Sequence, residues 1–292
     1  MDFGRLITAM LTPMLDDDSV DYEGAARLAN HLVDTGSDAI VVTGTTGESP
    51  TLTEAEKLDL YRVVLAAVGD RARVIAGSGN YCTAESIALT QAAERVGVHG
   101  AMLVVPYYNN PPQEGLYRHF SSVAEATGLP IILYNVPSRS PRNLEASTTI
   151  RLSEVNNIVA IKEASGKLEQ ITEIIAGTPE GFRVYSGDDS ATLPLMSMGG
   201  YGIISVASHV AGRLIRTMID HFAAGRVAEA AQLHGRLLPL FNACFCTTNP
   251  IPIKAGTDLL GLPSGSVRLP LIAADERVRE NMRREMAALG LI

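Results

Sequence analysis

Lysine is scarce in this chain, and one of its lysines lies in an apolar run. The chain has four lysines, at Lys57, Lys162, Lys167 and Lys254. Lys162 directly follows Ile158-Val159-Ala160-Ile161, a run typical of a strand that is covered on both faces. Because lysine is disfavoured in strands and is almost never buried without a partner, Lys162 is the first candidate for chemistry.

Alternation along this strand predicts what surrounds the Lys162 amine. Ala160 and Ala164 share its face, while Glu163 points to the opposite face. Desolvation lowers the pKa of a buried amine, and a neutral amine can condense with a carbonyl to give a Schiff base. The alternative is a structural lysine paired with a carboxylate, for which Glu163 is the candidate. The other three lysines lie in helical or polar stretches and are expected to be ordinary surface charges.

Phenols and an arginine follow two other apolar runs. Tyr134 ends Ile131-Ile132-Leu133, where a phenol can move a proton to or from a reacting atom, and Arg139 lies just beyond in a loop. The guanidinium of Arg139 suits a carboxylate. Tyr108 belongs to Pro106-Tyr107-Tyr108-Asn109 after another run. A core aromatic and a surface charge are the alternatives for Tyr134 and Arg139.

Two polar loops and one apolar wall complete the candidate site. Thr43-Gly44-Thr45-Thr46-Gly47-Glu48-Ser49 offers N–H and hydroxyl donors that can hold a small anion, but lacks the Gly-Lys-Ser/Thr ending of a nucleotide-binding P-loop. Ser186-Gly187-Asp188-Asp189 follows another run and could equally be an ordinary turn. Ile203-Ile204-Ser205-Val206 is apolar. The six histidines are scattered and no metal motif occurs, so no metal site is predicted.

These residues need a scaffold of alternating strands and helices. Eight units of about 25 residues, each an apolar strand followed by a helix, predict a parallel sheet closed into an α/β (β/α)8 barrel. Function would then gather at the carboxyl ends of the strands. An open doubly wound sheet is the alternative, but no dinucleotide fingerprint follows the first strand. We expect a catalytic barrel at 1–224 and a helical appendage at 225–292. The predicted strands are Leu6–Leu11, Ala39–Thr43, Arg73–Ala76, Ala101–Val105, Ile131–Tyr134, Ile158–Ile161, Phe182–Tyr185 and Gly202–Val206.

Composition narrows the class of protein. The 292 residues carry a net charge of −8, which argues against nucleic acid or an anionic membrane as the main partner. Three cysteines, Cys82, Cys244 and Cys246, are too few for a disulfide scaffold and are expected to be buried thiols. The start of the chain shows no signal peptide, and no apolar run is long enough to span a membrane, so a cytoplasmic location is expected.

Taken together, the motifs resemble the dihydrodipicolinate synthase family. The resemblance covers essentially the whole chain and rests on several motifs in register: Gly44-Thr45-Thr46-Gly47-Glu48-Ser49, Pro106-Tyr107-Tyr108-Asn109, Tyr134-Asn135-Val136-Pro137-Ser138-Arg139, Ile161-Lys162-Glu163-Ala164-Ser165-Gly166 and Asn249-Pro250-Ile251-Pro252-Ile253-Lys254. It implies a class I aldolase-type condensation of pyruvate with aspartate-4-semialdehyde, on the diaminopimelate route to lysine, with no cofactor. It also implies a homotetramer built as a dimer of dimers.

The resemblance implies a role for each candidate residue. Lys162 would form the Schiff base with pyruvate. Tyr134 would donate and accept protons in a relay with Thr45 and with Tyr108, the latter supplied across a subunit interface. Arg139 would receive the carboxylate of the aldehyde. Pyruvate would be held by Thr46, Ile204 and Gly187.

Two alternatives and two departures remain open. N-acetylneuraminate lyase and 2-keto-3-deoxy sugar acid aldolases share the lysine and tyrosine, but the Thr45-Thr46 pair and Arg139 favour the synthase. A catalytically silent keto-acid sensor should have lost Lys162 or Tyr134. Ser140-Pro141 stands where the family usually has Thr-Gly, which stiffens the substrate loop. Glu54, Lys57 and Tyr81 replace residues of the lysine-binding cleft while Glu85 and Tyr107 remain, so weak or absent feedback by lysine is predicted.

Overall fold

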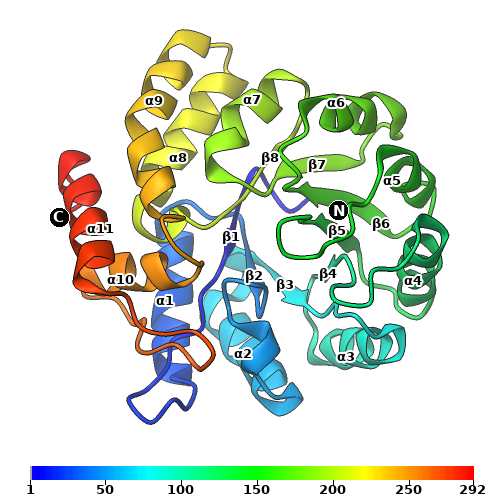
Figure 1. The fold of residues 1–292 in the computed structure, drawn as a ribbon, viewed down its shortest axis with the longest axis horizontal. Helices are drawn as coiled ribbons and strands as arrows, with labels where there is room; N and C mark the ends of the chain where they lie inside the picture. Colours follow the sequence, from blue (N-terminus) through cyan, green and yellow to red (C-terminus); the bar gives the residue numbers. More distant parts are fainter. Residues whose placement is uncertain (1) are drawn as a thin grey trace. The chain divides into compact units, whose positions relative to one another are not determined.

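Eight parallel strands form a closed barrel in chain order. The computed structural model describes residues 2–292, and its strands are joined in the order β1 to β8 (Figure 1). The (β/α)8 prediction is confirmed, and each predicted strand is present with ends shifted by no more than a few residues. The strands are β1 (Leu6–Ala9), β2 (Ala39–Val42), β3 (Arg73–Gly77), β4 (Gly100–Val104), β5 (Ile131–Asn135), β6 (Ile158–Glu163), β7 (Arg183–Ser186) and β8 (Gly202–Ser205).

Helices follow the strands and continue beyond the last one. They are α1 (Tyr22–Asp34), α2 (Glu54–Val68), α3 (Thr83–Val96), α4 (Gln113–Glu125), α5 (Ala146–Leu152), α6 (Leu168–Gly177), α7 (Thr192–Ser197), α8 (Ser208–Ala223), α9 (Val227–Ala243), α10 (Ile251–Leu259) and α11 (Glu276–Ala288). Short 3-10 turns lie at η1 (Ser49–Thr51), η2 (Gly69–Arg71) and η3 (Asp189–Ala191). Three helices beyond β8 and α8 confirm the predicted helical continuation.

Local sequence explains where several elements begin and why the strands are covered. β2, β5 and β8 are buried along their whole length, as apolar strands of a barrel with helices outside should be. Thr53 and Glu56 form a reciprocal capping box at the start of α2. Asp21 and Asp275 accept backbone N–H groups at the starts of α1 and α11.

The chain divides into two compact units. One holds residues 75–204 with residues 2 and 3, and the other holds Gly4–Val74 and Ser205–Ile292. In the first unit, Tyr134 of β5 lies in register with Lys162 of β6, which in turn lies in register with Tyr185 of β7. In the second unit, α9 and α10 pack against α8, and α11 packs against α9 and α10. The division at residue 224 between a catalytic barrel and an appendage stays a prediction.

Within residues 2–292, no helix combines the length and apolar character that a bilayer span requires.

Candidate active site

Lys162 is buried at the carboxyl end of β6. Its side chain is 4% exposed, and its Nζ lies 4.4 Å from the centroid of the Tyr134 ring. Gly187, just after β7, leaves room for it, because a Cβ at Gly187 would lie 3.3 Å from Cε of Lys162 and 2.7 Å from Cβ of Ala164. The predicted small-residue surroundings of the amine are therefore present, with a glycine as well as alanine.

Burial shifts the protonation of the Lys162 amine. Desolvation lowers the pKa of Lys162 from 10.5 to about 8, while the buried Asp189 carboxylate opposes this change and the Arg139 charge adds to it. A pKa of about 8 in place of 10.5 raises the neutral fraction at pH 7 about 300-fold. The amine therefore gains nucleophilic character from its position.

Glu163 does not pair with Lys162. Its carboxylate accepts N–H groups from Asn135 Nδ2 at 3.0 and 3.2 Å, from the Ser165 backbone at 2.6 Å and from Gln170 Nε2 at 3.2 Å. No ion pair among residues 2–292 includes Lys162. The alternative of a structural Lys162–Glu163 pair is wrong, because successive strand residues point to opposite faces.

Tyr134 and Arg139 flank the lysine differently. Tyr134 is buried and presents its ring to the amine. Arg139 is exposed in the turn after β5, where the Val136 carbonyl accepts the N–H groups of Arg139 and Ser140 at 2.9 Å each. Ser140 is fully buried and its hydroxyl also donates to that carbonyl at 3.1 Å. The loop that carries the guanidinium is thus closed by its own backbone.

Tyr108 lies apart from the lysine. It is 91% exposed and adopts a left-handed backbone with φ of 72°. In the part of the chain that is described, no hydrogen bond or ring contact joins Tyr108 to Tyr134 or Lys162.

The Thr45-Thr46 loop belongs to the other unit and has its own supports. Thr45 is half-buried, whereas Thr46 is 2% exposed and its Oγ1 accepts a hydrogen bond from Asn249 Nδ2 at 2.9 Å. Because the amide nitrogen can only donate, the Thr46 hydroxyl directs its own hydrogen elsewhere. Asn249 was noticed in the sequence only as part of a motif, and its Asn-Pro context gave no sign of this bond.

Lys254 corrects one prediction. It was expected to be a surface charge, yet it is 4% exposed and its Nζ lies 2.7 Å from Oε1 of Glu48. It also donates to the Ser266 carbonyl. Burial lowers the pKa of Lys254 and the Glu48 carboxylate raises it. The apolar neighbours in Ile251-Pro252-Ile253 were the available signal.

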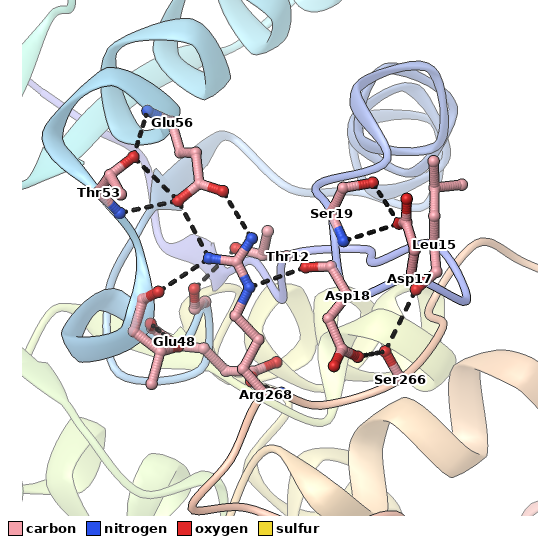
Figure 2. Close-up of polar contacts among 12 residues, drawn as sticks. Thr12, Leu15, Asp17, Asp18, Ser19, Glu48, Thr53, Glu56, Ser266 and Arg268 are labelled. Carbon is pink, nitrogen blue, oxygen red and sulfur yellow. Dashed lines mark hydrogen bonds and ion pairs between the residues drawn. The ribbon is translucent and has the colours of Figure 1, made fainter.

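Arg268 extends this anchoring network (Figure 2). Its backbone N–H donates to Glu48 Oε2 at 3.0 Å, and its guanidinium binds the Glu56 carboxylate and the Asp18 carbonyl. The Arg268 guanidinium holds the pKa of Glu56 at about 2. Asp18 also accepts from Ser266 Oγ at 2.7 Å. These contacts hold the segment near residue 268 against the loop that carries Thr45 and Thr46.

Ile204, the three cysteines and possible metal ligands were also considered in the sequence, and the structure places them as follows. Ile204 is fully buried in β8, as expected of an apolar wall. Of the cysteines, Cys244 is buried, Cys82 is half-buried and Cys246 is exposed, so the expectation of three buried thiols was wrong in part. Among residues 2–292, no cluster of three His, Cys, Asp or Glu side chains could hold a metal ion.

A closed (β/α)8 barrel with a desolvated lysine at the carboxyl end of its sixth strand defines a lyase of the class I aldolase type. The model of the dihydrodipicolinate synthetase family matches residues 2–289, and the chain belongs to that family. It is 58% identical over 292 residues to the 4-hydroxy-tetrahydrodipicolinate synthase of Moorella thermoacetica, covering 100% of both chains. It is 55% identical over 291 residues to the enzyme of the same name from Heliobacterium modesticaldum, covering 100% of this chain and 97% of the relative.

Solved structures agree over the whole fold. The chain is 49% identical, with a TM-score of 0.98 and 99% of both chains covered, to the dihydrodipicolinate synthase of Cyanidioschyzon merolae solved with lysine bound. A TM-score of this size over 99% of both chains shows the same arrangement of strands and helices in the two proteins.

Proposed function

We propose that this chain condenses pyruvate with L-aspartate-4-semialdehyde through a Schiff base at Lys162, the reaction that gives its relatives their name. The single observation that carries the proposal is the Lys162 amine, 4% exposed, over the Tyr134 ring and outside any ion pair of residues 2–292. A metal-independent aldol reaction needs such an amine.

The lysine supplies the chemistry of the first half-reaction. The neutral amine adds to the keto carbon of pyruvate, and loss of water leaves an iminium. The iminium draws electrons from the neighbouring methyl carbon, so that carbon can release a proton near neutral pH. The resulting enamine attacks the aldehyde carbon of the second substrate. The aldehyde oxygen then takes up a proton and becomes a hydroxyl group.

Tyr134, Thr45 and Tyr108 are proposed to carry the protons of this sequence. The Tyr134 ring is already next to the amine, at 4.4 Å from its centroid to Nζ. A positioned phenol contributes general acid–base catalysis. The 91% exposure of Tyr108 supports a role across a subunit interface, where a partner copy would receive it. The homotetramer implied by the family resemblance, and a cytoplasmic location, are part of this proposal.

The pyruvate carboxylate is proposed to bind at Thr46, with Gly187 and Ile204 shaping the space around the keto acid. The Asn249 bond supports this role, because it leaves the Thr46 hydroxyl hydrogen available for an anion. Arg139 is proposed to bind the carboxylate of the aldehyde, and its exposure suits a group that meets the second substrate as it arrives.

Borohydride trapping tests the proposal. With pyruvate present, reduction should inactivate the enzyme and add the mass of one reduced pyruvyl group to the peptide that carries Lys162. The variant Lys162→Met should gain no such mass, while Lys167→Met, which removes an exposed lysine nearby, should be trapped normally. A pyruvyl adduct elsewhere, or none, would contradict the proposal. Rates with aspartate semialdehyde and with N-acetylneuraminate then identify the acceptor.

Weak feedback by lysine is a separate prediction. Tyr81 and Tyr107 contact edge to face at 5.2 Å, and Asn80 donates to Glu85 at 2.8 Å. Glu85 and Tyr107 remain from the lysine-binding cleft of the relatives, but Glu54, Lys57 and Tyr81 replace other residues of that cleft. We expect activity to fall by less than about twofold at 1 mM lysine, which corresponds to a binding free energy weaker than about 4 kcal/mol. Strong inhibition at sub-millimolar lysine would contradict this.

A further inference from the structure

Glu163 is a buried carboxylate that the reaction leaves unassigned. It is 2% exposed, adjacent in sequence to Lys162 and directed away from it, toward Gln170 of α6. Its hydrogen-bond partners are neutral N–H groups from Asn135, Ser165 and Gln170, and no ion pair within residues 2–292 includes it. Burying a charge without a cation costs free energy, so the hydrogen bonds of Glu163 must compensate that cost.

Those contacts join the two ends of the loop that carries Arg139. Asn135, at the end of β5, donates to Glu163 and also to Asn143 Oδ1 at 3.0 Å, and its own oxygen accepts the Leu144 N–H at 2.9 Å. Gln170 donates to Glu163, and its oxygen accepts from Asn143 Nδ2 at 2.7 Å. The loop at 136–143 therefore starts and ends on side chains that Glu163 or its partner Gln170 holds.

The charge of Glu163 also fixes the direction of this network. A carboxylate only accepts, so the amides of Asn135 and Gln170 must both turn their NH2 groups toward it. Their oxygens then face the other way, where the Leu144 N–H and the Asn143 NH2 donate to them. A neutral amide at position 163 would place its own NH2 group opposite N–H groups that now donate to the carboxylate. Two donors cannot bond to each other, so hydrogen bonds of the network would be lost.

We propose that Glu163 is a positioning residue that sets the geometry of the loop at 136–143, and through it the affinity for the carboxylate of the aldehyde. The inference rests on the proposed role of Arg139 in binding that carboxylate. It assigns Glu163 to the second substrate and not to pyruvate, although it neighbours the Schiff-base lysine in sequence.

The test separates the two substrates. Glu163→Gln should raise the KM for aspartate semialdehyde about tenfold, the effect of losing one hydrogen bond to a charged group. The KM for pyruvate and the rate of borohydride trapping at Lys162 should stay within about twofold of their values in the unsubstituted protein. Both depend on Lys162, which lies on the opposite face of β6 from Glu163. The same substitution at the exposed Glu169 is the matched control and should change neither KM.

A reversed pair tests the direction of the network. In Glu163→Gln/Gln170→Glu the carboxylate and the amide exchange places, so donors and acceptors can match again, and the KM for the aldehyde should return toward the original value. An unchanged KM for the aldehyde in Glu163→Gln would overturn the inference, as would a parallel rise in the KM for pyruvate. If Glu163→Gln does not fold, Gln170→Met provides the milder break and should raise the same KM.

Arg139→Ala distinguishes failure of the inference from failure of its premise. If Arg139→Ala raises the KM for the aldehyde and Glu163→Gln does not, the role of Glu163 is wrong. If neither substitution raises it, the role proposed for Arg139 is wrong as well. Amide hydrogen exchange over 136–143 reports on the loop itself and should accelerate in Glu163→Gln but not in Glu169→Gln.

Discussion

Two lysines of this chain are equally buried and have opposite surroundings. Lys162 of β6 and Lys254 of α10 are each 4% exposed. Lys254 lies 2.7 Å from a Glu48 oxygen, whereas Lys162 faces an aromatic ring and Gly187. Burial alone therefore does not mark a reactive lysine, and the presence of a close carboxylate separates the two.

The contrast follows from electrostatics. A carboxylate in contact favours the ammonium form and holds the Lys254 amine in a bond to its partner. Desolvation is the largest influence on both amines and lowers the pKa of each. For Lys254 the Glu48 carboxylate in contact opposes this change, whereas the pKa of Lys162, which the Asp189 carboxylate raises, still falls to about 8. One lysine is thus suited to reaction with a carbonyl and the other to anchoring Glu48, which itself adopts a left-handed backbone with φ of 56°.

The largest expected effect comes from removing the unpaired lysine. Lys162→Met should lower kcat/KM at least about ten-thousandfold, because the covalent path is lost. Lys254→Met should still trap pyruvate at Lys162 under borohydride, as measured by mass spectrometry of the digested protein. Loss of trapping in Lys254→Met would mean that the two lysines are not separable in this way.

Breaking the paired lysine should act on stability. Lys254→Met leaves the Glu48 carboxylate buried without its cation, and the free energy of unfolding should fall by about 3 to 5 kcal/mol. Urea denaturation measures this. Glu48→Gln/Lys254→Met removes both charges and should recover part of the loss. A double variant no more stable than the single one would show that the cost is not one of an unpaired charge.

Tyr134→Phe separates the ring from its hydroxyl. The ring face beside Nζ remains, so trapping of pyruvate should persist, while turnover should fall about a hundredfold or more through loss of the proton-transfer group. Steady-state rates and trapping yields on the same preparation check this. Equal losses in the turnover rate and in the trapping yield would contradict this, because they would show that the hydroxyl is not specific to proton transfer.

The smallest effect is a gain in stability. The pKa of Lys162 is about 8 in the folded protein and has an ordinary value of 10.5. Below pH 8 both states are protonated, and the folded state bears the full cost of the buried ammonium. Lys162→Met should therefore be more stable at pH 7 by about 3 kcal/mol. As the pH rises from 8 to 10.5 the gain should shrink, and unfolding curves at pH 7 and pH 10 test this.

Much of the fold could be predicted because local patterns determine it. The Ile158–Glu163 strand follows from apolar residues and alternation, and the start of α2 follows from the Thr53–Glu56 capping box. The burial of Lys162 followed from the same pattern. The surroundings of Lys254 could not be predicted, since its partner Glu48 is about two hundred positions away in the chain. The bond between Asn249 and Thr46 is long-range in the same sense, since the two residues are also about two hundred positions apart.

Competitive acetylation of the folded protein tests the central claim most directly. A trace of acetic anhydride is applied from pH 6 to pH 11, and modification of each lysine is read by mass spectrometry, with the exposed Lys167 as the internal reference. Modification of Lys162 should reach half its maximum near pH 8, the pKa set by its burial, while Lys254 stays unmodified. A midpoint for Lys162 near 10.5, or equal modification of Lys254, would contradict the account.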